Sequence, residues 1–377
     1  MKKIYWQVQQ INRIGGAEMV SIDLANHLSK DYDITLISTV KIEGDIPYHI
    51  EPTVTVTSWG IPKRIERVDV LTSKYLKHWR IFSLLALYCQ VLYHYVLKRP
   101  VYMRRMQKKL LEDDAILICS AIDGYMLAPR KGKVFFHFHF DAPTFFRFDN
   151  RFVFKHYRKP DKFIFLTKVA LDGVLEKMPE LKDKAVYVHN PFRFFRVLNT
   201  NYHNNTIIFA GRFNTQKNPM LALSIAKELK DRNFPFVLRM FGDPIMKKEM
   251  DLYIEENHLE DVIELHGPSN YIHDEMLNSD ILLLTSIYEG LPLVLAEANA
   301  LSLPWVSSYW GPVIDEAFVD GKNGIVIRDG EVSSYADAII GLLSSKEKLI
   351  EAKKNAFEQS VNLSHEVIIP LWKEILK

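Results

Sequence analysis

Cysteine is scarce in this chain of 377 residues: only Cys89 and Cys119 occur, and no C-x-x-C pair is present. A disulfide framework and a zinc ribbon are therefore excluded, and the usage fits a reducing compartment. The amino-terminal stretch turns polar by Gln7, which is too early for the apolar core of a secretory signal peptide. These absences favour a cytoplasmic protein.

Several sequence motifs that mark common enzyme sites are missing. No G-x-G-x-x-G follows an expected strand, and no P-loop, H-E-x-x-H or G-x-S-x-G occurs. One D-x-D, at Asp31 and Asp33, could hold a metal–diphosphate, but it falls between a helix and a strand, where acidic turn residues are common. We interpret it as a solvated turn, and we predict no metal site.

No uncharged run is long enough to span a membrane. The longest candidate, from Ile81 to Leu97, has 17 residues without a formal charge and includes Ser83, Gln90 and His94. A spanning helix needs about 20 predominantly apolar residues. We interpret this run as a buried or interfacial helix.

The net charge of +2 hides an uneven distribution. Residues 1–203 carry 32 Lys and Arg against 20 Asp and Glu, whereas residues 204–377 carry 16 against 26. Residues 63–109 alone carry 12 basic residues against two acidic ones. Nucleic acid, anionic lipid and a phosphorylated substrate all fit such a surface, but no nucleic-acid-binding module accompanies the charge. We therefore predict that 63–109 contacts an anionic membrane surface, peripherally and without a spanning helix, and we predict no nucleic-acid partner.

Short β-branched or aromatic runs alternate with helical patterns along the whole chain, which predicts an α/β fold with parallel sheets. The series restarts near residue 206, after an Asn-rich segment at 190–205 that we interpret as a linker between two doubly wound domains. Strands are expected at 3–8, 33–38, 53–57, 115–119, 133–138, 162–166, 185–188, 206–210, 236–241, 262–265, 280–285, 304–308 and 324–327. Helices are expected at 16–30, 70–97, 101–112, 218–232, 246–258, 293–302, 331–344 and 363–377.

The first motif with chemical content runs from Gly211 to Pro219, between an expected strand and an expected helix. Glycine permits close backbone approach, and a helix amino terminus favours anions. Arg212 can grip two phosphate oxygens as a fork, while Lys217 supplies a point charge. The pattern indicates a diphosphate clamp, although a helix start with two exposed cations has the same appearance.

The second motif runs from Ser286 to Ala298 and follows an apolar strand. Gly290 and Pro292 predict a turn, with Glu289 before the helix and Glu297 one turn inside it. Glu297 has only apolar neighbours in sequence, so its carboxylate needs hydrogen-bond donors, and ribose hydroxyls would supply two. The N–H groups of Leu293 and Val294 have no partner within the helix and could hold phosphate.

These two motifs at this spacing resemble the donor site of glycosyltransferase family 4, the retaining GT-B enzymes, with Glu289 and Glu297 as the E-x7-E pair. The resemblance covers nearly the whole chain and is closest to bacterial capsule, exopolysaccharide and teichoic-acid transferases. One departure is Ser302, where the family usually has glycine, and we expect a slight packing change there. Further matching segments are Gly15 to Glu18, Phe241 to Asp243, Gly311 to Glu316 and Asp320 to Gly324.

The resemblance implies two facing doubly wound domains with a cleft between them: an acceptor-side domain at 1–195 and a donor-binding domain at 204–360, with helix 363–377 crossing back to the first. It also implies a nucleotide-sugar donor, with UDP-sugar favoured, and no metal ion. By resemblance, Arg212 and Lys217 bind the diphosphate, Glu297 the ribose and Glu289 the transferred sugar. The remaining implied donor contacts are Gly211 and backbone amides from Gly290 to Val294 (Leu293 among them). Gly15 and Gly16 would close on the donor phosphate or on the acceptor from the opposite domain.

A third pattern is the alternation of His137, His139 and Asp141, which places them on one face of an expected strand. An iron site of two histidines and one carboxylate is conceivable, but ligands along a straight strand spread over about 13 Å. A hydrogen-bonded polar strand end is a second interpretation. By resemblance, a histidine here contacts the sugar; we choose His139, with His137 as the alternative.

The sequence thus predicts a retaining glycosyltransferase that moves a sugar from a nucleotide-diphosphate sugar to a glycan or lipid-linked acceptor in bacterial polysaccharide synthesis, at the inner face of the cell membrane. A GT-B-shaped nucleotide-sugar epimerase would share the cleft. A two-lobed sugar-binding protein is the non-enzymatic alternative. The base, the sugar and the acceptor are not given by the sequence.

Overall fold

A computed structural model describes residues 1–13, 15–61, 81–93, 101, 104–105, 108, 114–121, 132–139, 145–146, 160–193, 195–318 and 320–377. The chain forms two compact units: Met1–Phe165 with Gly173–Tyr187, and Leu166–Asp172 with Val188–Lys377. The change to the second unit comes at Val188, so the Asn-rich segment that we interpreted as a linker belongs to the second unit. Residues 363–377 group with the second unit as well.

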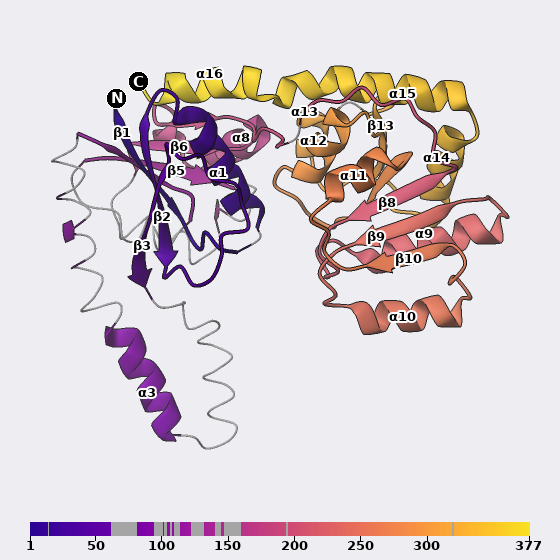
Figure 1. The fold of residues 1–377 in the computed structure, drawn as a ribbon, viewed down its shortest axis with the longest axis horizontal. Coiled ribbons are helices and arrows are strands. Elements are labelled where there is room, and N and C mark those ends of the chain that lie inside the picture. Colours follow the sequence, from indigo (N-terminus) through magenta and orange to yellow (C-terminus); the bar gives the residue numbers. More distant parts are fainter. Residues whose placement is uncertain are drawn as a thin grey trace. The chain divides into compact units, whose positions relative to one another are not determined.

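The first unit contains a parallel sheet whose seven described strands follow the order β3-β2-β1-β4-β5-β6-β7. Figure 1 labels β1, β2, β3, β5 and β6 of this sheet. Its central strands are buried on both faces and mostly apolar, as a sheet covered by helices requires. The strands are β1 Lys3–Val8, β2 Asp33–Val40, β3 Thr55–Ile61, β4 Ile116–Cys119, β5 Lys133–Phe138, β6 Lys162–Phe165 and β7 Ala185–Tyr187; the helices are α1 Gly16–Leu28, α3 Ile81–Leu92, α8 Lys168–Lys177 and the short η2 Pro179–Leu181. The unit boundary runs through α8.

The second unit repeats this topology with a parallel sheet in the order β10-β9-β8-β11-β12-β13. Helices α9 and α14 pack into a buried cluster on one face, and α11, α12 and α13 pack into a cluster on the other face. The strands are β8 Thr206–Ala210, β9 Val237–Phe241, β10 Ile263–His266, β11 Ile281–Leu284, β12 Trp305–Ser308 and β13 Gly324–Ile327. The helices are α9 Pro219–Asp231, α10 Lys247–Glu256, α11 Ile272–Leu277, α12 Leu293–Ala300, α13 Val313–Ala317, α14 Val332–Leu343, α15 Lys346–Gln359, η3 Ser360–Leu363 and α16 His365–Ile375.

A buried ion pair lies at the amino end of β11. Lys353 of α15 places its Nζ atom 3.7 Å from Oδ1 of Asp280, and their side chains are 1% and 0% exposed. The ammonium also donates to the Ser279 carbonyl, while the Asp280 carboxylate accepts from the N–H groups of His203 and Thr206. Burial lowers the pKa of Lys353. Since a buried charge is tolerated only with such partners, this network fixes α15 to the sheet.

The expected strands all occur within a few residues of their observed bounds. Helix 293–302 ends earlier, at Ala300, because Ser302 adopts a left-handed backbone with φ of 58°. Helices α8, α11, α13 and α15 were not predicted. Of the expected helices 70–97 and 101–112, only Ile81–Leu92 is a described helix, and most of the remainder lies outside the described residues.

Candidate functional site

The loop after β8 lies against the end of β9. The N–H of Gly211 donates to the Phe241 carbonyl at 3.0 Å, and the N–H of Phe213 donates to the Asp243 carbonyl at 3.1 Å. A Cβ atom on Gly242 would lie 2.0 Å from the Gly211 carbonyl oxygen, so this crossing of two loops requires glycine at position 242. The buried Phe213 ring anchors the loop in the core of the second unit.

Lys217 sits at the end of this loop, immediately before α9. Its N–H donates to Oδ1 of Asn214 at 3.0 Å, and its Nζ atom lies 2.6 Å from Oε1 of Glu289. The two side chains of this pair are only 15% and 10% exposed. Arg212, by contrast, is exposed, and its side chain has no ion pair with any described residue. In the predicted clamp, therefore, one cation is paired with a carboxylate and the other is open to solvent.

The loop after β11 is fixed to the same place. The N–H of Ile287 donates to the Gln216 carbonyl at 2.8 Å, and the Gln216 side chain donates to the Tyr288 carbonyl at 3.1 Å. Thr285 holds its hydroxyl 2.9 Å from the carbonyl oxygens of Lys217 and Asn218. These bonds bring the two sequence motifs together, although about 70 residues separate them.

Helix α12 begins where this second loop ends. Pro292 precedes it, and Leu293 and Val294 supply its first N–H groups, which a helix cannot pair internally. Glu297 lies one turn further on with a side chain only 6% exposed, and its Oε1 accepts from Nε of Arg193 at 2.8 Å. Sequence reasoning expected a buried carboxylate that needs donors, but it missed Arg193, because the segment before residue 204 was interpreted as a linker.

In the first unit, Gly15 caps the start of α1 and Gly16 is the first residue of that helix. The N–H of Gly15 donates to the Tyr48 hydroxyl at 2.8 Å, and that hydroxyl lies 3.0 Å from the Arg13 carbonyl. Tyr48 was not predicted, and no local pattern marks it.

His139 follows the last residue of β5. Neither of its ring nitrogens is exposed to solvent or hydrogen-bonded to a described residue, and its ring lies 4.1 Å from that of His137. Burial lowers the pKa of His139 to about 4, so the imidazole is neutral at physiological pH. Burial and the neighbouring His139 also lower the pKa of His137. The two rings share one face as the alternation predicted; Asp141 lies outside the described residues.

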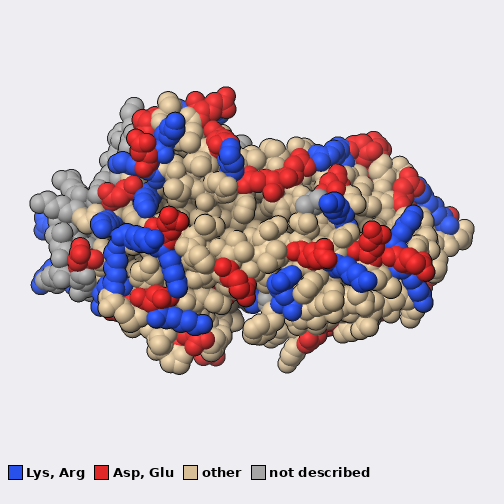
Figure 2. Space-filling model, turned by 90° about the horizontal axis from the view of Figure 1, so that it is seen from above, with Lys and Arg blue, Asp and Glu red and all other residues tan. Residues whose placement is uncertain are grey.

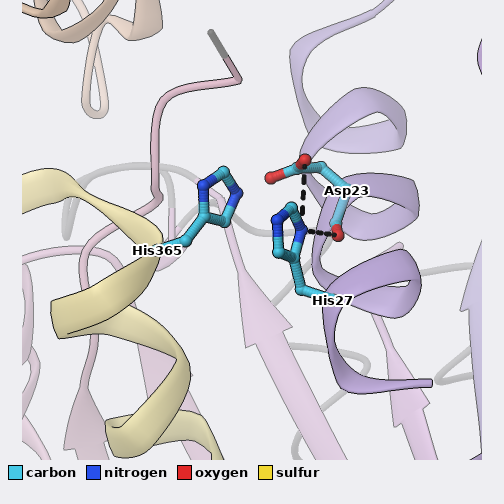
Figure 3. A group of neighbouring side chains, drawn as sticks. All are labelled: Asp23, His27 and His365. Carbon is cyan, nitrogen blue, oxygen red and sulfur yellow. Dashed lines mark hydrogen bonds and ion pairs between the residues drawn. The ribbon is translucent and has the colours of Figure 1, made fainter. Parts of the chain in front are cut away.

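A separate titratable pair lies within α1. His27 places Nδ1 3.0 Å from the Asp23 carbonyl oxygen and 3.6 Å from its Oδ1, one helical turn away (Figure 3). An acidic residue four positions before a basic one is the orientation that favours a helix. Asp31 and Asp33, the D-x-D pattern, are exposed at the turn into β2, and Asp33 pairs with Lys3 at 3.4 Å. The interpretation of this pattern as a solvated turn agrees with that placement.

The basic segment 63–109 is described only in part. Among its 12 basic residues, the structure describes Arg104, Arg105 and Lys108. Helix α3 carries exposed apolar side chains, including Phe82 at 88% and Leu85 at 63%, so it is not a core helix. On the face drawn in Figure 2, basic and acidic side chains are interspersed, and neither sign covers it. Within the described ranges, every helix is too short or too polar to cross a bilayer.

Comparison with known proteins gives a consistent result. Residues 192–359 match the family described as glycosyl transferases group 1. The amylovoran biosynthesis glycosyltransferase AmsD of Erwinia amylovora is 27% identical, with all of both chains aligned. An α-1,4-N-acetyl-D-galactosaminyltransferase of Campylobacter jejuni, named for an acceptor that ends in PP-undecaprenol, is 22% identical over all of this chain and 98% of its own length. A crystal structure of a TarM mutant from S. aureus in complex with UDP superposes with a TM-score of 0.78 at 13% identity, covering 100% of both chains. This similarity shows the GT-B fold.

Proposed function

Because the chain is a glycosyltransferase whose residues 192–359 match the group 1 family, we propose that it is a retaining enzyme that uses a nucleotide-diphosphate sugar. UDP-sugar is the favoured donor, and UDP is the nucleotide in the TarM complex. The acceptor is a glycan or a lipid-linked saccharide of bacterial polysaccharide synthesis. AmsD, by its name, serves amylovoran biosynthesis, and the Campylobacter relative acts on a PP-undecaprenol-linked saccharide.

The observation that carries this proposal is the joining of the β8 and β11 loops. It places Arg212, Lys217, Glu289 and the amino terminus of α12 in one region of the second unit. The cations and the helix N–H groups suit a departing diphosphate, where positive groups stabilise the charge that develops in the transition state. Glu297 suits the hydroxyl groups of a ribose. No protein nucleophile is assigned; the donor phosphate itself takes the acceptor proton in a front-face reaction.

The second half of the proposal concerns metal independence. Arg212, Lys217 and the start of α12 supply the positive charge that a divalent cation supplies in other nucleotide sites. Transfer is therefore expected to survive excess EDTA. Loss of transfer on chelation, with recovery on adding Mn²⁺ or Mg²⁺, would contradict this part of the proposal.

His139 and the basic segment belong to the acceptor side of the proposal. A neutral histidine with both nitrogens buried can donate one hydrogen bond and accept another, which suits a sugar hydroxyl. Residues 63–109 and the exposed apolar side chains of α3 suit an anionic lipid surface, where each Lys or Arg contributes about 1 kcal/mol. We propose peripheral association with the cytoplasmic face of the membrane.

A thermal-shift screen tests the donor class first. UDP, ADP, GDP, CDP and their sugars are added without metal, and a ligand at about 100 times its Kd should stabilise the fold by about 2.7 kcal/mol. We expect UDP and a UDP-sugar to raise Tm, and transfer with that donor to give a product whose anomeric configuration is kept. If no nucleotide raises Tm and no donor is turned over, the donor site is wrongly assigned. Interconversion of the donor sugar without an acceptor would instead indicate an epimerase.

The two glutamates give a sharper test of the same site. Glu297→Gln should weaken both the free nucleotide and the nucleotide sugar, because both contain ribose. Glu289→Gln should spare the free nucleotide and mainly lower transfer, because Glu289 is assigned to the sugar. Calorimetry with both ligands separates the two, and equal effects of each variant on each ligand would contradict the assignment.

Liposome sedimentation tests the membrane part. The protein should sediment with anionic liposomes at low salt, leave them at high salt and ignore neutral ones. Replacing Lys98, Arg99, Arg104 and Arg105 by Ser should weaken this binding while donor hydrolysis in solution persists. A protein that ignores anionic liposomes at low salt would have a soluble acceptor.

A further inference from the structure

Arg193 comes from a segment that α12 holds at several points. Phe192, directly before it, is buried in the cluster that contains Leu295, Ala296 and Ala298 of α12, and its N–H donates to the Leu363 carbonyl. Further along, the N–H of Val197 donates to the Ala300 carbonyl at 2.8 Å. The backbone on both sides of Arg193 is therefore fixed to α12 or to η3.

Ser302 adds a second attachment. Its hydroxyl lies 2.8 Å from the Val197 carbonyl oxygen, and it accepts from the N–H of Asn199 at 3.1 Å. This serine occupies a left-handed conformation, with φ of 58°, that glycine would adopt more easily. Ser302, a strained residue, thus also holds the segment that carries Arg193, through a pair of hydrogen bonds that the sequence did not predict.

The contact of Arg193 with Glu297 is specific. Nε of the guanidinium lies 2.8 Å from Oε1 of the carboxylate, the carboxylate side chain is 6% exposed and the guanidinium side chain is 30% exposed. The Glu297 side chain can rotate about its own bonds, and each orientation of the carboxylate presents different lone pairs to a ligand. A donor fixed by its own backbone selects one of these orientations before any ligand arrives.

We propose that Arg193 is a positioning residue: it fixes the Glu297 carboxylate in the orientation that recognises the ribose hydroxyls of the nucleotide. This inference rests on the proposed function, since it takes Glu297 as the ribose contact. Arg193 itself need not touch the nucleotide. Its role is to make binding sensitive to whether the 2′- and 3′-hydroxyls are present.

The experiment compares a nucleoside diphosphate with its deoxy counterparts. The wild-type protein is titrated with UDP, 2′-deoxy-UDP and 3′-deoxy-UDP, or with the corresponding set for whichever diphosphate the screen finds tightest. A hydrogen bond to a charged group predicts that the loss of the recognised hydroxyl weakens binding about tenfold to a hundredfold. The ratio of interest is the Kd of the deoxy form divided by the Kd of the ribose form. In Arg193→Met this ratio should be no more than about three.

Matched variants separate positioning from a general structural effect. Arg196→Met removes a neighbouring arginine whose guanidinium bonds Ser360 and the Phe357 carbonyl instead, so it should keep the wild-type ratio. Glu297→Gln should lose the ratio, and adding Arg193→Met to it should cause no further loss. Arg193→Lys keeps the charge without the Nε donor and should also lose most of the ratio; it replaces Arg193→Met if that variant does not fold.

The outcomes are distinct. If the wild-type protein binds no nucleoside diphosphate, the proposed donor site has failed. If it binds but shows no preference for the ribose form, or if Arg193→Met and Arg193→Lys keep the full preference, the positioning role is overturned while the donor site stands. A uniform weakening of ribose and deoxyribose forms by Arg193→Met would also overturn it, because only a structural role predicts that pattern.

Discussion

The loops that follow the first strand of each unit, β1 and β8, occupy equivalent places in two sheets with the same order of central strands, yet their contacts differ. In the first unit, the loop carries the exposed Arg13 and engages a neutral tyrosine hydroxyl at Gly15, and the candidate His139, after β5, is held neutral by burial. In the second unit, the loop carries Arg212 and Lys217, and Lys217 meets a carboxylate. The two loops therefore differ in their contacts: the β8 loop forms an ion pair, whereas Gly15 of the β1 loop bonds a neutral hydroxyl.

The largest expected effect comes from removing the paired cation. Lys217→Ala should cost about 2–4 kcal/mol of transition-state stabilisation, seen in kcat/KM, because it removes a cation that the proposed function assigns to the departing diphosphate. It also leaves the Glu289 carboxylate, 10% exposed, without its ammonium. Arg212→Lys should also lower activity, because lysine keeps the charge but lacks the planar guanidinium group that can bind two phosphate oxygens. Lys230→Ala, which removes a cation of α9 that pairs with Asp261, should leave transfer unchanged; near-normal turnover of the Lys217 and Arg212 variants would rule out the charged loop as the donor site.

The next effect concerns the shape of that loop. Gly242→Ala places a Cβ atom 2.0 Å from the Gly211 carbonyl oxygen and 2.9 Å from the Phe213 ring. Overpacking of this kind should lower the free energy of unfolding of the second unit by about 1–3 kcal/mol, which urea denaturation measures. Gly267→Ala is the matched control, since its Cβ atom would meet nothing within 4 Å and its φ is not positive. Equal stability of the two variants would show that the loops do not need their close crossing.

The third effect concerns the neutral imidazole of His139, which the pH dependence of stability tests. The folded-state pKa of His139 is about 4, below its ordinary value of 6.5, so the folded chain binds fewer protons than the unfolded chain between these values. The contribution of this histidine to the free energy of unfolding is therefore fully present above about pH 6.5. It is lost as pH drops toward 4, by at most about 3 kcal/mol. His139→Gln should reduce this slope, measured by hydrogen exchange of β5 amides; His49→Gln, at the surface, should not. An unchanged slope in His139→Gln would show that this imidazole is not held neutral.

The smallest effect is expected at Ser302. Ser302→Ala loses the hydroxyl bonds to Val197 and Asn199 but keeps the left-handed strain, so it should destabilise the second unit by about 1–2 kcal/mol. Ser302→Gly loses the same bonds but relieves the strain, and should cost under about 1 kcal/mol. Urea denaturation of both variants checks the order. A glycine variant less stable than the alanine variant would contradict it.

Local chemistry made much of this molecule predictable. The strands are runs such as Ile116–Cys119 and Ile281–Leu284, apolar throughout because helices cover both faces of each sheet. The loops after β8 and β11 were singled out because glycine, proline and charge fall together just after such runs. These signals are short in range, and they are present in a single sequence.

The remainder depended on contacts between distant residues. Helix α15 was missed because one of its buried positions is Lys353, whose charge interrupts the apolar period and is compensated by Asp280, 73 positions earlier in the sequence. Arg193 and Tyr48 were missed for the same reason, since their partners Glu297 and Gly15 are far away along the chain. The pairing of Lys217 with Glu289 could not be predicted either, although both residues were singled out.

Because Lys353 is buried, the rate at which it is chemically modified reports on the opening of the second unit. An amine that is 1% exposed and held by Asp280 and the Ser279 carbonyl cannot reach an acylating reagent while α15 stays on the sheet. Surface lysines such as Lys247, 53% exposed, are modified at once. The rate of Lys353 acetylation, measured by mass spectrometry, therefore reports how often α15 leaves the sheet. This measurement follows the second unit alone, whereas the unfolding of the whole chain would combine the transitions of both units.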